Sequence, residues 1–185
     1  MRDLKIIARL FGGIGSQLFI YAATRRLAML NNSELVLDHV RGFTRDADYQ
    51  RHYQLVHLNI HSRKASESEG LYLFNRFRRK ILRSWNQRKS FEQRTYLSQE
   101  SIDFHPQLLA YKPRGALYLG GYWHSEHYFN DEAATLQYVL KIKPEFDAAS
   151  HLQQYTVISK CLLFHEPHTA GSNITLNNSR TDTGA

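Results

Sequence analysis

The sequence predicts an α/β fold with a Rossmann-like parallel sheet, and three features of its first forty residues carry that prediction. A short apolar segment, residues 4–10, runs directly into the glycine-rich residues 11–15. A helical pattern follows and leads into a second apolar segment, residues 34–38. Strand, glycine turn, helix and strand in that order form a βαβ unit, whose two strands run parallel on the same sheet.

Each further element is predicted from its own pattern. Residues 4–10 are expected to be a buried strand because they are short, largely apolar and end at glycines. Ser16 is the expected N-cap of the first helix, which two asparagines at 31–32 end. Later in the chain we expect an extended stretch at 55–60, a helix over 71–85, a strand at 117–119 and a helix over 131–140.

Composition indicates an ordinary globular chain with a preference for anionic partners. The 185 residues carry a net charge of +7, with 42% apolar and 22% charged residues. The single cysteine, Cys161, excludes an intramolecular disulfide framework and a cysteine-based zinc cluster. No apolar run approaches the roughly 18 residues that cross a bilayer, and the start lacks the apolar core of a signal peptide. We therefore expect a cytoplasmic protein with one domain over 1–155 and a divergent, disordered C-terminal tail over 156–185.

The glycine turn at residues 12–17 has the chemistry of a helix N-terminus that accepts an anion. Unpaired backbone N–H groups and the positive end of the helix dipole suit a phosphate, and glycines let a ligand approach the backbone. The pattern departs from G-x-G-x-x-G because Leu18 occupies the third glycine position, and no Gly-Lys-Ser/Thr follows as in a P-loop. Asp38 stands where a dinucleotide fold places its ribose-binding carboxylate, so an NAD-binding oxidoreductase is one alternative. A tight turn without any ligand is another.

Two long motifs together point to a family. Residues 9–22, R-L-F-G-G-I-G-S-Q-L-F-I-Y-A, resemble the N-terminal signature of bacterial α-1,2-fucosyltransferases (glycosyltransferase family 11), approximately R-L-x-G-G-L-G-N-Q-L-F-Q-Y-A. Residues 118–129, Y-L-G-G-Y-W-H-S-E-H-Y-F, are similar to that family's Y-L-x-G-Y-W-Q-S-E-K-Y-F. Residues 51–60 are similar to its R-x-x-x-L-x-x-F-N-I stretch, and the F-H-P of 104–106 falls in the expected order. The resemblance covers about residues 4–147.

The resemblance implies an inverting transfer of L-fucose from GDP-fucose to the 2-hydroxyl of a galactoside or related glycan, with no metal and no other cofactor. It implies the N-terminal half of a GT-B-like enzyme, in which two Rossmann-like domains face each other across a cleft. The glycine turn would then face the donor. The donor-binding candidates are Gly12, Gly13, Gly15, Ser16 and Gln17.

The second motif supplies the candidates for catalysis and acceptor binding. A transfer to a hydroxyl needs a group that accepts or polarises its proton, and His124 and Glu126 are the candidates. The aromatic faces of Tyr122 and Trp123, with the hydroxyl of Ser125, suit a sugar acceptor. The alternative is that these aromatic residues pack in the core.

Two departures from the family pattern bear on activity. Ser16 stands where the family has asparagine, and its shorter hydroxyl cannot donate and accept through two separate atoms as an amide does. The donor-binding signature H-x-R-R-G-D-Y is expected shortly after residue 150, but no Arg-Arg pair follows Arg79. We therefore expect a truncated chain with impaired transfer. A non-catalytic remnant or acceptor-binding module is the alternative.

One hypothesis for the divergent tail is a frameshift. Synonymous codons for residues 167–171, read one base forward, permit His-Ile-Arg-Arg-Gly, although that frame cannot continue into Asp-Tyr. The gene sequence tests the hypothesis, since an intact H-x-R-R-G-D-Y in a neighbouring frame would support it. Neither the acceptor glycan nor the oligomeric state follows from the sequence.

The basic stretch Arg76–Arg94 suits an anionic membrane surface, which would place the protein at the inner face of the membrane. A solvated helix face is the alternative. Nucleic-acid binding is not expected, because no module signature accompanies the charge. The histidines are scattered, and His165 and His168 belong to the divergent tail, so no metal site is expected.

Overall fold

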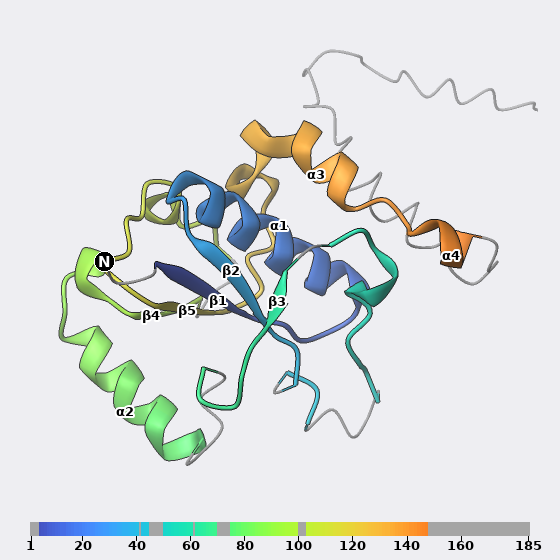
Figure 1. Cartoon of the computed structure of the whole chain (residues 1–185). Helices are drawn as coiled ribbons and strands as arrows, with labels where there is room; N and C mark the ends of the chain where they lie inside the picture. Colours follow the sequence, from blue (N-terminus) through green and yellow to red (C-terminus); the bar gives the residue numbers. More distant parts are fainter. Residues whose placement is uncertain are drawn as a thin grey trace, which may run out of the picture.

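The structure is a computed structural model that describes residues 4–40, 42–44, 50–60, 62–69, 75–99 and 103–147. These residues form a five-stranded sheet with the strand order β3-β2-β1-β5-β4, and every neighbouring pair of strands is parallel (Figure 1). The predicted α/β class with a parallel sheet is confirmed. The predicted tail over 156–185 lies outside the described residues.

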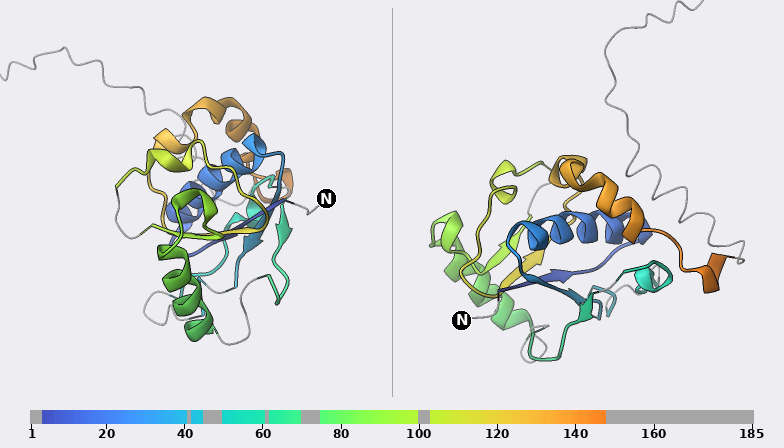
Figure 2. Two further views of the ribbon diagram at one scale, coloured as in Figure 1. Left: turned by 90° about the vertical axis from the view of Figure 1, so that its left-hand side faces the viewer. Right: turned by 45° about the horizontal axis from the view of Figure 1, so that its top comes forward.

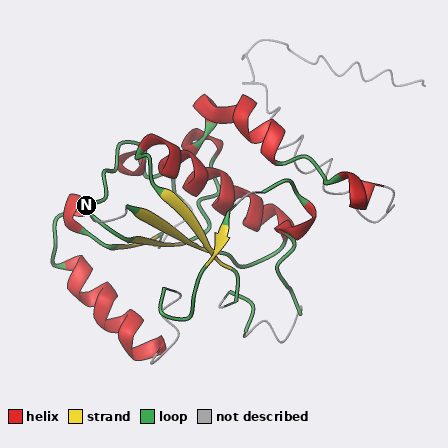
Figure 3. Cartoon of the chain, viewed as in Figure 1, coloured by secondary structure: helices red, strands yellow, loops and turns green. Residues whose placement is uncertain are grey.

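Figure 3 shows how helices and 3-10 turns surround the strands. The strands are β1 (Lys5–Arg9), β2 (Glu34–Asp38), β3 (Arg63–Lys64), β4 (Tyr96–Ser98) and β5 (Leu117–Gly120). The α-helices are α1 (Ile14–Leu30), α2 (Asn75–Gln87), α3 (Ala133–Val139) and α4 (Pro144–Asp147). The 3-10 turns are η1 (Leu55–His57), η2 (Phe91–Gln93), η3 (Pro106–Leu108), η4 (Glu126–Tyr128) and η5 (Asn130–Glu132).

The start of α1 differs from the prediction. Gly13 is the N-cap, with φ −73° and ψ 176°, and its carbonyl accepts a hydrogen bond from the Gln17 N–H at 3.0 Å. The prediction that Ser16 caps the helix is therefore wrong, since Ser16 lies inside the first turn. Glycine is also a favoured N-cap, and it leaves the first backbone N–H groups without a side-chain partner.

The predicted extended stretch at 55–60 is also corrected. Residues 55–57 form the 3-10 turn η1, and only Leu58 pairs, as an isolated antiparallel bridge to Ile142. The Asn59 N–H continues this contact to the carbonyl of Lys141 at 2.9 Å. The apolar side chains of this segment suit a strand. The buried ones, Leu55 and Leu58, instead belong to a turn that packs on the core.

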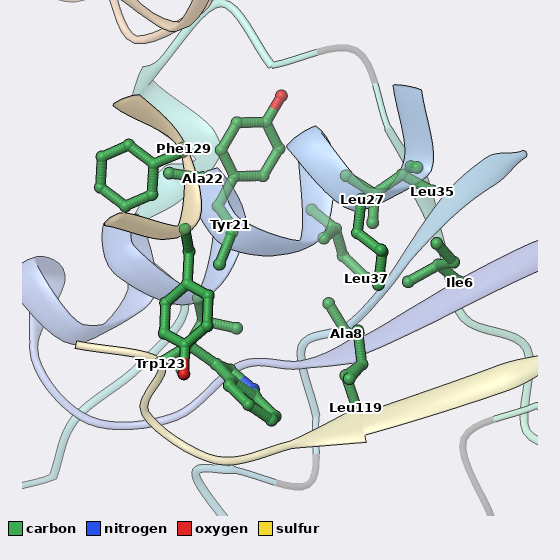
Figure 4. Close-up of a cluster of buried hydrophobic side chains, with 14 of the residues drawn as sticks. Ile6, Ala8, Tyr21, Ala22, Leu27, Leu35, Leu37, Leu119, Trp123 and Phe129 are labelled. Atoms are coloured by element: carbon green, nitrogen blue, oxygen red, sulfur yellow. The ribbon is translucent and has the colours of Figure 1, made fainter. Parts of the chain in front are cut away.

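The core lies between the sheet and α1 (Figure 4). Alternate residues of the strands face the helix, as in a pleated sheet with one face covered. The buried residues that α1 contributes are Gln17, Leu18, Ile20, Tyr21, Ala22, Ala23, Thr24, Leu27 and Ala28. Full burial of one such leucine stabilises the fold by about 1.5–3 kcal/mol, so α1 is firmly held and its first turn has a fixed place.

The helix α3 lies beyond α1 on the same side of the sheet (Figure 2). The guanidinium of Arg26 in α1 contacts Asp131 in the turn before α3. Its Nε and Nη2 donate to Oδ2 of Asp131 at 3.1 Å and 2.7 Å. The same side chain donates to the carbonyl of Leu109 at 2.6 Å. These contacts hold the segments before and after β5 against α1.

The other face of the sheet carries a smaller apolar cluster of Ile7, Val36 and Tyr118. Beside it, Glu69 accepts hydrogen bonds from Lys5 at 2.8 Å and from Arg63 at 2.7 Å. These two cations hold the pKa of the Glu69 carboxyl well below its usual range. The helix α2 lies on this side, next to β4 (Figure 2). Among the described helices, none is long and apolar enough to cross a membrane.

Candidate functional site

The carboxyl ends of the parallel strands meet at one edge of the sheet, and both family-like motifs lie there. From β1 the chain turns outward to β2 and β3, and later reaches the opposite side of β1 through β4 and β5. The order of the strands therefore reverses between β1 and β5. In open α/β sheets, ligands bind outside the carboxyl ends of the strands at such a switch point. The glycine turn follows β1, and residues 121–126 follow β5.

The glycine turn combines one position that requires glycine with two that are open. Gly12 has φ +78°, and a Cβ there would lie 3.0 Å from the Cβ of Ser16. A side chain at Gly12 is therefore strained in its backbone and crowded by its neighbour. A Cβ on Gly13 or Gly15 would meet nothing within 4 Å. The turn leaves its backbone open to approach at the start of α1, as an anion site requires.

Gln17 holds the turn together from inside the protein. Its side chain is fully buried, and Nε2 donates to the carbonyls of Gly12 and His52, each at 3.0 Å. Its Oε1 accepts the N–H of Gln54 at 3.0 Å. The side-chain amide of Gln17 therefore forms its hydrogen bonds with backbone groups of the glycine turn and of the loop at 52–54. Gln17 is a positioning residue that lies behind the turn.

A row of ring side chains joins the two motifs. Phe11 contacts Tyr122 edge-to-face with ring centroids 4.6 Å apart, and Tyr122 lies 4.9 Å from the ring of His124. His124 in turn lies 5.2 Å from Phe19 of α1. A Cβ on Gly12 would lie only 3.8 Å from Cε1 of Tyr122. The turn and the second motif, far apart in the sequence, are therefore in direct contact.

The two aromatic acceptor candidates have different surroundings. Tyr122 is 46% exposed, so its ring is accessible at this edge. Trp123 is only 3% exposed and packs edge-to-face on Tyr128, with centroids 5.7 Å apart (Figure 4). Its backbone has φ +51°, and its N–H donates to Oε1 of Gln99 at 2.6 Å. The structure therefore puts Trp123 in the core, as the packing alternative expects, while Tyr122 faces solvent.

The buried Trp123 has a left-handed backbone and lies between two exposed side chains, Tyr122 and His124. A non-glycine residue in this region costs about 1–3 kcal/mol and is kept only where the surroundings demand it. Here the demand comes from Gln99 and from the buried indole. Gly121, with φ +141°, lies so close to Gln99 that a Cβ would approach its Cβ to 2.5 Å. Gln99 thus shapes the loop, and the sequence offered no sign of its role.

The candidate base His124 is exposed, and partial desolvation lowers its pKa below 6.5. The imidazole is therefore neutral at neutral pH and able to accept a proton. Glu126 begins η4 and is half-buried, and Ser125, also half-buried, donates its N–H to the carbonyl of Trp123 at 2.8 Å. No hydrogen bond or ion pair joins His124 to Glu126, so the two candidates do not act as a coupled pair in this structure.

Arg9 is a site residue to which sequence reasoning gave no role. It ends β1, and its guanidinium carbon lies 5.0 Å from the centroid of the Phe11 ring. Its Nε is buried and has no hydrogen-bond partner, and among the described residues the side chain forms no ion pair. A cation therefore stands next to the glycine turn. Its place at the end of the strand, three residues before Gly12, was the available signal.

Asp38, the candidate for ribose binding, is buried at the end of β2. Its Oδ2 accepts a hydrogen bond from the Tyr118 hydroxyl at 2.7 Å. The carboxylate thus contacts a side chain of β5, on the far side of β1, and is buried from solvent. A ribose hydroxyl cannot reach it in this conformation, which weakens the basis for an NAD-binding site.

The opposite edge of the sheet carries a pocket that the sequence did not predict. Its volume is about 630 Å³, and it lies before the amino ends of β4 and β5. Its walls include Phe91, Tyr111, Lys112 and Arg114. In the described ranges, no three histidine, cysteine or acidic side chains are placed to hold a metal ion.

Comparison with known proteins gave no relative. No family model matches the sequence, and no curated protein or solved structure matches it either. The candidate site therefore rests on its own geometry.

Proposed function

We propose that this chain forms the N-terminal half of a GT-B-like glycosyltransferase and takes part in fucosyl transfer from GDP-fucose to the 2-hydroxyl of a galactoside. One observation carries the proposal. The open backbone of the glycine turn and the exposed Tyr122–His124 pair lie in contact at the switch point of the sheet. An anion-accepting turn beside a sugar-sized aromatic surface is what a nucleotide-sugar reaction needs.

On the donor side, three features suit a diphosphate. The first N–H groups of α1 have no side-chain cap, and Gly13 and Gly15 leave room for a phosphate to approach them. Arg9 supplies the nearby positive charge, and none of the described carboxylates forms an ion pair with it. In a chain without an Arg-Arg pair after Arg79, this cation and the helix N-terminus stabilise the charge that develops on the departing diphosphate.

On the acceptor side, Tyr122 provides a ring surface and His124 the base. In the proposed step, the acceptor hydroxyl oxygen attacks the anomeric carbon of fucose from the face opposite the phosphate. The bond between that carbon and the β-phosphate oxygen breaks, GDP departs with the electron pair, and the hydroxyl proton passes to a ring nitrogen of His124. The lowered pKa of His124 keeps that nitrogen unprotonated at neutral pH.

Transfer by this chain is expected to be slow, because one cation replaces the two guanidiniums that the family signature would place on the leaving group. A carbohydrate-binding module without catalysis is the second candidate. The exposed ring of Tyr122 favours it, since sugar stacking requires no donor site.

The direct test is a binding and turnover series on the full chain. GDP, GDP-fucose, NAD and lactose are titrated by calorimetry, and fucosyl-lactose is then measured from GDP-fucose plus lactose. The proposal expects saturable binding of GDP and GDP-fucose, no binding of NAD, and slow product formation. Lactose binding alone would support the module, and saturable NAD binding without a response to GDP would support an oxidoreductase.

A further inference from the structure

The helix α2 is a protruding element with a single buried anchor among its described side chains. It leaves the body of the molecule on the side of the sheet opposite α1 (Figures 1 and 2). Asn86, near its end, is buried, and its Oδ1 accepts the N–H groups of Thr95 at 2.7 Å and Tyr96 at 3.3 Å. These bonds orient the helix on the edge strand β4 and direct the rest of its surface outward.

The outward surface of α2 carries large apolar side chains. Trp85 is 65% exposed and Ile81 is 39% exposed. They are four residues apart, so they lie on one face of the helix. Their face is turned away from the anchor at Asn86. No described residue covers this apolar pair.

The charge around this pair has one sign. Residues 70–91 contain no aspartate or glutamate. The exposed cations whose side chains the structure describes are Lys80, Arg83, Arg88 and Lys89. A helix face adapted only to water usually mixes both signs of charge, which form stabilising pairs along it. Several exposed cations on a helix segment without acidic residues, beside an exposed tryptophan, therefore indicate a partner that is anionic and apolar at once.

We propose that α2 docks on the surface of a bilayer containing anionic lipids, with Trp85 and Ile81 in the interface and the cations at the headgroups. A lipid interface satisfies both requirements, because tryptophan is favoured at headgroup depth and basic side chains are attracted to acidic lipids. A nucleic acid would meet the positive charge but would leave Ile81 exposed to water. The inference goes beyond the proposed transfer and does not depend on it.

The chain provides its own optical probe for this test. It has two tryptophans, and Trp123 is buried while Trp85 is exposed. The full chain is mixed with phosphatidylcholine vesicles, with or without 30% phosphatidylglycerol, and emission is recorded. We expect a blue shift and quenching by brominated lipid only with the anionic vesicles, with weaker binding in concentrated salt. Trp85→Phe should abolish the spectral change while the protein still co-sediments with the vesicles.

Two pairs of variants decide between mechanisms. Lys80→Glu with Arg88→Glu should weaken vesicle binding at least about tenfold. Lys112→Glu with Lys141→Glu, which changes the net charge equally at other exposed positions, should change it little. Trp85→Ala should also weaken binding about tenfold, with an unchanged melting temperature because the side chain is exposed.

Three results with vesicles would each overturn the proposal. These are no binding to anionic vesicles at low salt, binding without any shift or quenching of Trp85, and equal loss of binding in both charge-reversal pairs. Tighter binding to a transfer RNA that is insensitive to Trp85→Ala would also overturn it.

Discussion

The two edges of the parallel sheet differ in what they leave open. The amino edge has a pocket of about 630 Å³ whose walls are side chains, including Lys112 and Arg114. The carboxyl edge offers backbone at Gly13 and Gly15, an exposed ring at Tyr122 and the cation of Arg9, whose buried Nε has no hydrogen-bond partner among the described residues. Strand direction brings a helix N-terminus only to the carboxyl edge. The presence of a cavity therefore does not by itself identify the nucleotide site. Matched substitutions at the two edges distinguish them.

The largest expected effect is on stability, at Gln17. Gln17→Leu removes a buried amide and leaves the carbonyls of Gly12 and His52 and the N–H of Gln54 without partners. We expect a loss of about 3 kcal/mol in the free energy of unfolding, measured by urea denaturation. The matched control is Gln107→Leu at the amino edge, where the residue is exposed and the change should be small. Equal effects at both positions would contradict the role given to Gln17.

The next effect is at Gly12. Gly12→Ala forces a Cβ into a backbone at φ +78° and against Ser16. We expect a loss of about 2 kcal/mol, seen as a melting temperature lower by about 4–8 °C. At Gly115, near the amino edge, a Cβ meets nothing within 4 Å, so Gly115→Ala should melt close to the wild type. A Gly12→Ala protein with unchanged melting would show that the turn is not held in this conformation.

The cations of the two edges should differ in GDP binding. Arg9→Gln removes the charge beside the glycine turn, and we expect GDP affinity to fall about tenfold by calorimetry, as for loss of one charge-assisted contact. Arg114→Gln in the amino-edge pocket removes the same charge from the molecule and should leave the affinity nearly unchanged. The reverse order would assign the nucleotide to the pocket.

The smallest effect is the pH response of His124. Burial lowers its pKa in the folded protein, so the unfolded chain binds more protons as the pH falls through 6.5. The contribution of His124 to the free energy of unfolding is therefore complete above the pKa of the unfolded chain. It is lost as the pH falls through the pKa of His124 in the folded protein. We expect the wild type to lose about 1 °C relative to His124→Gln between pH 7.5 and 5, because solvent screens an exposed group. A gain in relative stability at acid pH would contradict the burial argument.

The parts predicted from sequence are those set by local pattern. Glu34–Asp38 is a strand over its predicted range, and the strands at 4–10 and 117–119 and the helix α1 lie within a few residues of theirs, because apolar periodicity decides them. The start of α1 was less determined, since both Gly13 and Ser16 are favoured N-caps. The turn at 55–57 was missed because its apolar side chains suit either a strand or a packed turn.

The sequence indicated where the candidate site lies better than it indicated what each of its residues does. The two motifs do meet at one edge, but only the fold decides which side chains face solvent. Tyr122 and Trp123 are neighbours in the sequence, but Tyr122 is exposed, whereas Trp123 is buried in the core with a positive φ. Gln17 is covered by the loop at 52–54, and no periodic pattern in the sequence predicts where that loop lies.

The central claim is that the open backbone of the glycine turn receives a phosphate. Calorimetric titration of GDP into Gly13→Ala and Gly115→Ala tests it most directly, since a Cβ at either position meets no protein atom within 4 Å and both proteins should stay folded. We expect Gly13→Ala to bind GDP at least about tenfold more weakly, because its methyl group occupies the approach to the α1 N-terminus, while Gly115→Ala binds as the wild type does. Equal affinities in the two variants would contradict it.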